Sequence, residues 1–312
     1  MNKKSMCAVA ALVLAVRMRT TKVSQGNAEA ARGGDVGGAV LLAALTAGTL
    51  GALSAGRTLG WGASATVLLA AGAICALAAF IIVERRSPVP TVDLSLFRVG
   101  PFAVANILNA LTNGAAFVIW LLVPYLAVNV LGHPARVAGF VLAVAPMAMA
   151  VVAPRVGRLS DRIGAAAIAS AGIAICAVGL LGLSRPAATT STAFLVAVLA
   201  VIGLGLGTFQ VPNMSFVMGS VGSERQGMAG GLTQMMRTVG IVASVSLASS
   251  VFDRRYHALR PLGGKAGDLA DNAAWTEAFR YVVLLATLVA VGSAVLSVAG
   301  RGVRLNATAR SR

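Results

Sequence analysis

Eight apolar stretches of about twenty residues, nearly free of charge, follow one another along this chain. An α-helix rises about 1.5 Å per residue, so such a stretch crosses the roughly 30 Å hydrocarbon layer of a bilayer. Only helices and closed barrels satisfy their backbone hydrogen bonds in lipid. We therefore expect helical spans at 36–56, 62–83, 103–129, 136–156, 165–183, 193–218, 226–252 and 277–299.

A large soluble helical domain is the alternative interpretation. Its helices would carry polar residues at every third or fourth position, where they meet water. Segments 63–83 and 194–207 carry no such stripe. The composition, 57% hydrophobic and 12% charged, also departs from that of ordinary soluble domains. The sequence predicts an all-α polytopic membrane protein with eight transmembrane helices.

The net charge of +16 does not indicate a nucleic-acid partner, because the basic residues are spread over short segments between apolar spans. Such residues set orientation, since cytoplasmic loops collect Lys and Arg. The segments that would share one side, including 17–35, 155–162 and 301–312, are richer in them than the segments of the other side. We expect both termini in the cytoplasm and a plasma (inner) membrane of the bacterial type.

The first sixteen residues fit no complete span. The apolar run 5–16 is only about 18 Å long as a helix, too short to cross. It is interpreted as the stump of an earlier span. A signal peptide is an alternative because Lys3 and Lys4 precede it, but Arg17 and Arg19 follow and no clear cleavage site does. A peripheral anchor is the other alternative.

Cysteine and histidine show no pattern typical of a metal site or a disulfide. Cys7, Cys75 and Cys176 stand singly in apolar runs, and His133 and His257 lie far apart in sequence. We expect no metal, no cofactor and no enzyme activity, since no cluster of His, Asp or Cys gathers at an interface.

Glycines within one span resemble a nucleotide-binding fingerprint only superficially. No strand precedes Gly203, Gly205 and Gly207, and they lie inside an apolar stretch. The four-residue spacing of Gly203 and Gly207 is instead typical of close helix packing.

Acidic residues are few, and none falls in the middle of a span. A carboxylate in mid-span is the usual marker of a proton or ion pathway. All ten lie in loops or at span ends: Glu29, Asp35, Glu84, Asp93, Asp161, Glu224, Asp253, Asp268, Asp271 and Glu277. The sequence therefore predicts no buried proton-coupling carboxylate.

The most specific local pattern is the segment from Gly157 to Gly164, expected to be a charged turn between two spans. Both glycines permit positive φ and close approach. Asp161 would cap the helix that follows, and Arg158 and Arg162 would pair with it or reach a neighbouring helix. An ordinary basic cytoplasmic loop is the alternative.

Polar residues inside the spans are further candidates. Asn106, Asn109 and Asn113 lie within about 60° of one another on a helix, and Phe117 and Trp120 continue the stripe. This face would line an aqueous cavity for amphipathic compounds, or bond neighbouring helices together.

Two later spans carry the remaining polar candidates. Gln210 and Asn213 flank Pro212, which bends a helix, either for gating or for packing. Gln234 and Arg237 share a face with small residues that begin at Gly227. Arg237 would snorkel to the cytoplasmic interface, or contact a substrate or partner.

The pattern Gly-x-x-x-Asp-Arg-x-Gly at 157–164 resembles the cytoplasmic gating motif of the major facilitator superfamily. Further stretches are similar to its fourteen-helix drug:proton antiporter branch, and the resemblance covers about residues 30–300. They are Trp61, 83–86, 93–98, 130–132, Ala138 with Gly139, 203–207 and 227–240. One departure weakens any charge lock, because Ala165 and Ala166 stand where the family usually has basic residues.

The resemblance implies a domain organisation. Residues 1–35 would hold the stump and a cytoplasmic basic segment, 36–100 two linker helices and a cytoplasmic loop, and 101–300 the C-terminal six-helix bundle. Residues 301–312 would form a cytoplasmic tail. The N-terminal bundle, where the resemblance places the embedded acids and the antiporter signature, would be missing.

It also implies a function: proton-coupled efflux of drugs or other amphipathic small molecules by a truncated or split transporter. The protein would contact membrane lipid and, if it is split, a separate N-terminal half. The implied gating residues are Gly157, Arg158, Asp161, Arg162 and Gly164. The cavity candidates are Asn106, Asn109, Asn113, Trp120, Gln210, Asn213, Gln234 and Arg237. The alternative function is a non-transporting membrane partner with a structural or regulatory role.

Overall fold

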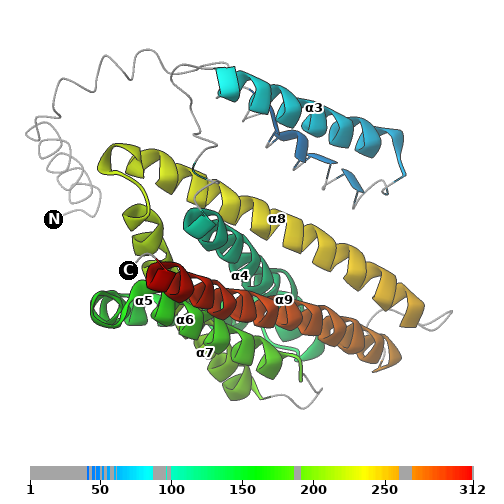
Figure 1. Cartoon of the computed structure of the whole chain (residues 1–312). Coiled ribbons are helices and arrows are strands. Elements are labelled where there is room, and N and C mark those ends of the chain that lie inside the picture. Colours follow the sequence, from blue (N-terminus) through cyan, green and yellow to red (C-terminus); the bar gives the residue numbers. More distant parts are fainter. Residues whose placement is uncertain are drawn as a thin grey trace, which may run out of the picture.

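The computed structural model describes residues 62–86, 100–185, 191–259 and 269–310, with residue 96 and scattered positions between 41 and 60. The elements within these residues are helices, and no strand occurs among them, so the expected all-α architecture is confirmed (Figure 1). They are α3 (Ser64–Arg86), α4 (Gly100–Tyr125), the π-helical η4 (Leu126–Val130), α5 (Ala135–Ile163), α6 (Ala165–Leu183), α7 (Thr192–Gly219), the short η5 (Ser223–Arg225), α8 (Gln226–Leu259) and α9 (Leu269–Arg310).

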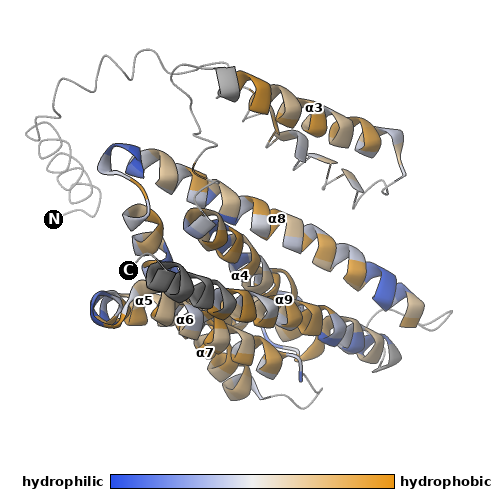
Figure 2. Cartoon of the chain, viewed as in Figure 1, coloured by the Kyte–Doolittle hydropathy of each residue, from blue (hydrophilic) through white to orange (hydrophobic). Residues whose placement is uncertain are grey.

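Seven of the described helical segments are long and apolar enough to cross a membrane, and they correspond to the last seven expected spans. Hydrophobic residues run along them and hydrophilic residues gather toward their ends, as on α8 (Figure 2). The segment 1–35 and most of the first expected span, 36–56, lie outside the described residues. The described positions within 41–56 are helical.

This helical segment runs antiparallel to α3. Gly48 lies against Ala73, and Gly51, three residues later, lies against Leu69. Residue numbers therefore rise along one segment as they fall along the other. The two elements form a helical hairpin, which is the arrangement expected of a linker pair.

Glycines set the close packing of α5, α6 and α7. A Cβ added to Gly203 would overlap the Ala145 backbone of α5, and one added to Gly205 would overlap Cys176 of α6. Small residues let helix backbones approach in this way, and packing contacts, rather than water exclusion, hold helices together in lipid. The close-packing role predicted for Gly203 is confirmed.

A second close contact joins α4 to α8. Gly240 lies against the backbone of Ala110, and Gly114 lies against Gly240 and Ser244. The small-residue strip predicted to begin at Gly227 makes contact at Gly230, where an added Cβ would meet Met218 of α7. No described atom lies within 4 Å of a Cβ added to Gly227 itself.

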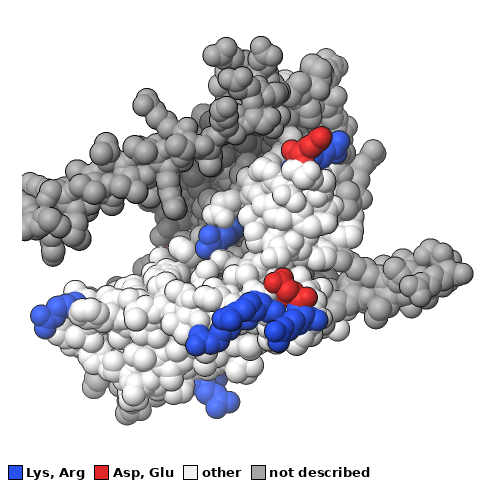
Figure 3. Space-filling model, turned by 90° about the vertical axis from the view of Figure 1, so that its left-hand side faces the viewer, with Lys and Arg blue, Asp and Glu red and all other residues white. Residues whose placement is uncertain are grey.

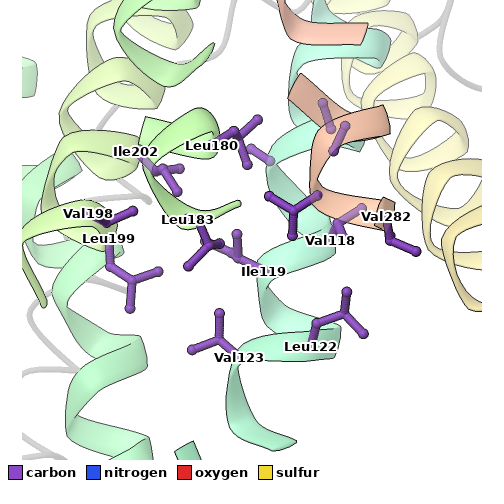
Figure 4. Close-up of a cluster of buried hydrophobic side chains, with 14 of the residues drawn as sticks. Val118, Ile119, Leu122, Val123, Leu180, Leu183, Val198, Leu199, Ile202 and Val282 are labelled. Carbon is purple, nitrogen blue, oxygen red and sulfur yellow. The ribbon is translucent and has the colours of Figure 1, made fainter. Parts of the chain in front are cut away.

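The main apolar core lies between α4, α6, α7 and α9 (Figure 4). Ile119 and Val123 of α4, Leu180 of α6 and Ile202 of α7 are at most 1% exposed. This core contacts the half of α4 that follows Asn113. The polar stripe therefore lies on the first half of α4, and the apolar core packs against the second half.

The junction of α5 and α6 differs from the expected turn. α5 continues to Ile163, and Gly164 alone separates it from α6, with φ 103° and ψ 133°. Gly157 is helical, and no side chain caps α6, so the capping role expected of Asp161 is wrong. The cause is local: residues 157–163 contain no helix breaker except Gly157, so the helix extends beyond its apolar part.

Candidate functional site

Polar side chains from three helices form one hydrogen-bonded network inside the bundle. Asn113 Oδ1 accepts hydrogen bonds from Gln210 Nε2 at 2.7 Å and from Arg237 Nε at 3.0 Å. Asn113 Nδ2 donates to the backbone oxygen and to Oδ1 of Asn109, both at 2.9 Å. Asn109 Nδ2 donates to the Thr233 backbone oxygen at 3.0 Å. The network ties α4 to α7 and to α8.

The network lies deep in the spans. Asn113 is about 20 Å along the helix from Gly100, near the middle of the 31-residue span Gly100–Val130. Asn109 and Asn113 are 4% and 3% exposed, while Gln210 and Arg237 are half-buried. Asn109 and Asn113 bond neighbouring helices together, which is one of the two roles expected of the three asparagines, whereas the side-chain hydrogen bond of Asn106 stays within α4. The cavity role stays a prediction.

Two buried polar atoms beside the network lack partners within the described part of the chain. Asn106 is fully buried and donates through Nδ2 to the Phe102 backbone oxygen at 2.9 Å, but its Oδ1 accepts no hydrogen bond there. The Thr112 hydroxyl is likewise unpaired. A buried polar group without a partner costs about 1–3 kcal/mol, so α4 has hydrogen-bonding capacity that the described fold does not use.

The other cavity candidates lie around the network without joining it. Asn213 is buried one turn after Gln210, and Gln234 is exposed one turn before Arg237. The half-buried Trp120 ring lies 6.0 Å from that of Phe117. Among the described residues, none of these three side chains bonds to the network.

The predicted gating residues gather at one end of the bundle. Arg158, Asp161 and Arg162 are exposed on the last two turns of α5. Figure 3 looks onto this end and shows basic side chains grouped together with acidic ones beside them. Arg158 Nε donates to the Pro154 backbone oxygen at 3.4 Å, and no described residue pairs with the Asp161 carboxylate. Their gating role stays a prediction.

The opposite end of the bundle contains a buried carboxylate that the sequence did not predict. Asp271 is 4% exposed, and Tyr256 Oη donates to its Oδ1 at 2.5 Å. Trp275, one turn further on, stacks on Tyr125 with ring centroids 4.6 Å apart. Asp271 lies at a span end as expected, but sequence periodicity gives no signal of its burial. The sequence signal that could have indicated this buried site is the presence of aromatic residues at the ends of three spans.

A pocket of about 290 Å³ opens beside this aromatic group. Its lining comes from α4, α8 and α9 and comprises Leu121, Leu122, Tyr125, Ser249, Phe252, Asp253, Tyr256, His257 and Trp275. Within the described residues no group of His, Cys, Asp and Glu could hold a metal ion.

Fold and site together define a polytopic helical membrane protein with a polar network at mid-depth. The family model of the Major Facilitator Superfamily matches residues 6–245. The chain belongs to the major facilitator superfamily, and the resemblance drawn from its motifs is confirmed.

Relatives within the family are transport and resistance proteins rather than enzymes. The multidrug resistance protein Stp of Mycobacterium tuberculosis is 31% identical over 73% of this chain and 42% of its own length. The riboflavin transporter RibZ of Clostridioides difficile is 30% identical over 52% of this chain and 35% of its own. The tetracenomycin C resistance and export protein of Streptomyces glaucescens is 29% identical over 70% of this chain and 42% of its own length. The chain spans less than half the length of these relatives.

Proposed function

We propose that this chain supplies the C-terminal six-helix bundle and linker helices of a transporter that exports amphipathic small molecules by proton coupling. The observation that carries this proposal is the network of Asn109, Asn113, Gln210 and Arg237. Polar and charged side chains are costly in lipid, so at this depth they mark a pathway between bundles. The names of the relatives, among them multidrug resistance and export proteins, support the same activity.

The exposed position of Gln234 indicates which side of the bundle faces that pathway. It lies on α8 within the apolar span Ser223–Leu259, one turn from Arg237. An amide in contact with lipid tails would lack hydrogen-bond partners. We infer that this side of α8 faces water or a second bundle, and that Trp120 and Asn213 contribute to the same cavity.

The activity needs that second bundle, because facilitator folds work by rocking one bundle against another around a central site. We propose that it comes either from a longer polypeptide of which this sequence is part or from a separate chain. The described carboxylates lie toward helix ends, so the group that carries the coupled proton is assigned to the second bundle. Gly157, Arg158, Asp161, Arg162 and Gly164 would act at the cytoplasmic gate, with both termini on that side.

Dye transport into inverted membrane vesicles tests the proposal. The vesicles contain either this chain alone or this chain joined to the N-terminal part of the M. tuberculosis relative. We expect ethidium uptake driven by an imposed pH gradient only with the joined protein, and its loss on adding a protonophore. Transport by the chain alone would refute the requirement for a second bundle. A correctly inserted joined protein without transport would favour the non-transporting role.

A further inference from the structure

Arg237 is a permanent positive charge at mid-depth. Arginine stays protonated in proteins, and its charge is costly inside a membrane unless it is paired or solvated. It lies about 20 Å along the helix from Ser223, inside the 37-residue span Ser223–Leu259. The bond to Asn113 also holds the guanidinium inside the bundle rather than at the surface.

The described bundle supplies Arg237 with a neutral partner only. Asn113 Oδ1 is an amide oxygen, and the neighbouring groups Asn109, Gln210 and Thr233 are uncharged as well. No described carboxylate pairs with the guanidinium, and no hydrogen bond from its two Nη atoms is formed within the described residues. Within the part of the chain that the structure describes, the charge is held in place but not neutralised.

The guanidinium is also pre-oriented. Its Nε is fixed by Asn113, and Asn113 is itself fixed by Gln210 and Asn109. The side chain is half-buried, so part of it remains accessible. Two Nη groups that bond to no described residue, on a fixed planar cation, match the two oxygens of a carboxylate, which arginine binds with two parallel hydrogen bonds.

We propose that Arg237 binds the carboxylate of those transported compounds that carry one, so that the substrates of this bundle include amphipathic organic anions or zwitterions besides cations. This inference rests on the proposed function and names its substrate class.

Two dyes with the same aromatic core and opposite charge test this. Fluorescein is an anion that carries a carboxylate, and rhodamine 6G is an esterified cation. Binding to the purified full chain in lipid nanodiscs is measured by fluorescence anisotropy, with empty nanodiscs as the blank. We expect fluorescein to bind, Arg237→Gln to weaken it at least tenfold, and Arg237→Lys to weaken it less. Rhodamine 6G affinity should change less than twofold.

Gln210→Glu tests the same charge without removing the arginine. Gln210 and Arg237 bond to the same oxygen atom, so a carboxylate at position 210 lies within reach of the guanidinium. We expect this internal counter-ion to reduce fluorescein affinity as much as Arg237→Gln does. Arg280→Gln, an exposed arginine on α9, is the matched control and should leave both dyes unaffected.

Three results would overturn the inference: no fluorescein binding to the unmodified chain, unchanged fluorescein affinity in Arg237→Gln, or equal losses for both dyes. Size-exclusion chromatography establishes that each variant is folded. If the Arg237→Gln variant is not folded, the fluorescein affinity of the Gln210→Glu variant decides the test. Because binding is measured without transport, charge-selective binding would stand even if the vesicle experiment failed.

Discussion

Asn113 is the residue on which the polar network depends. A single amide oxygen accepts from two donors on two helices, α7 and α8, while the amide nitrogen returns to α4. Sequence periodicity placed Asn106, Asn109 and Asn113 on one face, but partners on other helices depend on how each helix is rotated. That rotation is a property of the packed bundle and has no local sequence signal.

Asn113→Leu should lower the free energy of unfolding by about 1–3 kcal/mol, because Gln210 Nε2 and Arg237 Nε lose their acceptor. Unfolding of the purified chain in mixed micelles of increasing SDS content measures the change. Asn129→Leu is the control, since Asn129 is exposed and bonds only to its own helix at 3.4 Å. Equal stability of the two variants would contradict a structural role for the network.

Asp161→Asn should reduce transport by the joined protein and leave insertion unchanged. Asp161 is exposed and unpaired within the described residues, so its removal has no folding cost there. Initial rates of ethidium uptake measure the effect. Glu277→Gln is the control, because Glu277 forms only an exposed ion pair of 3.5 Å with Arg280. Normal uptake by the Asp161→Asn variant would contradict the gating role and indicate that residues 157–164 are an ordinary basic helix end.

At the scale of elements, helices pack most closely where glycine removes a side chain. α5, α6 and α7 meet through Gly172, Gly203 and Gly205, whereas α4 and α8 meet through Gly114 and Gly240. The sequence predicted such a contact for Gly203 from its spacing. The strip predicted on α8 contacts α7 at Gly230, whereas the spacing gave no signal that Gly240 lies against α4.

Gly240→Ala should destabilise the pairing of α4 with α8 by about 1–3 kcal/mol, since the added methyl group overlaps the Ala110 backbone. Gly231→Ala is the matched control on the same helix: no described atom lies within 4 Å of its Cβ position. That change should be neutral or stabilising, because alanine favours a helix over glycine by about 1 kcal/mol. Thermal unfolding of both variants, followed by circular dichroism, compares them, and the reverse order would refute the assigned contact.

At the scale of the whole molecule, the described bundle consists of two closely packed groups. α5, α6 and α7 form one, α4 and α8 form the other, and α9 contacts α4, α6 and α8 (Figure 1). The length of each apolar stretch predicted seven of these spans well, because the hydrophobic thickness of the membrane alone determines how long such a stretch must be. The ends of α5 and α8 were missed, since polar residues beyond the hydrocarbon layer continue the helix. The buried Asp271 was missed because its burial depends on three helices meeting.

Orientation of the whole chain is predicted from its basic segments and is tested by labelling. In a cysteine-free background, Arg158→Cys should react with a membrane-impermeant maleimide in inverted vesicles only. Arg280→Cys, at the opposite end of the bundle, should react in intact cells only. Both positions are exposed. The reverse pattern would place the basic end outside and remove the gating motif from the cytoplasm.

The single residue between α5 and α6 has a mechanical consequence. One residue spans at most about 3.6 Å, so neither helix can slide along its axis without pulling the other or unwinding its own end. Gly164 allows the chain to change direction between the two helices, but it adds no length that would let them move apart. A displacement of the charged end of α5 along its axis would therefore move the first turn of α6 with it.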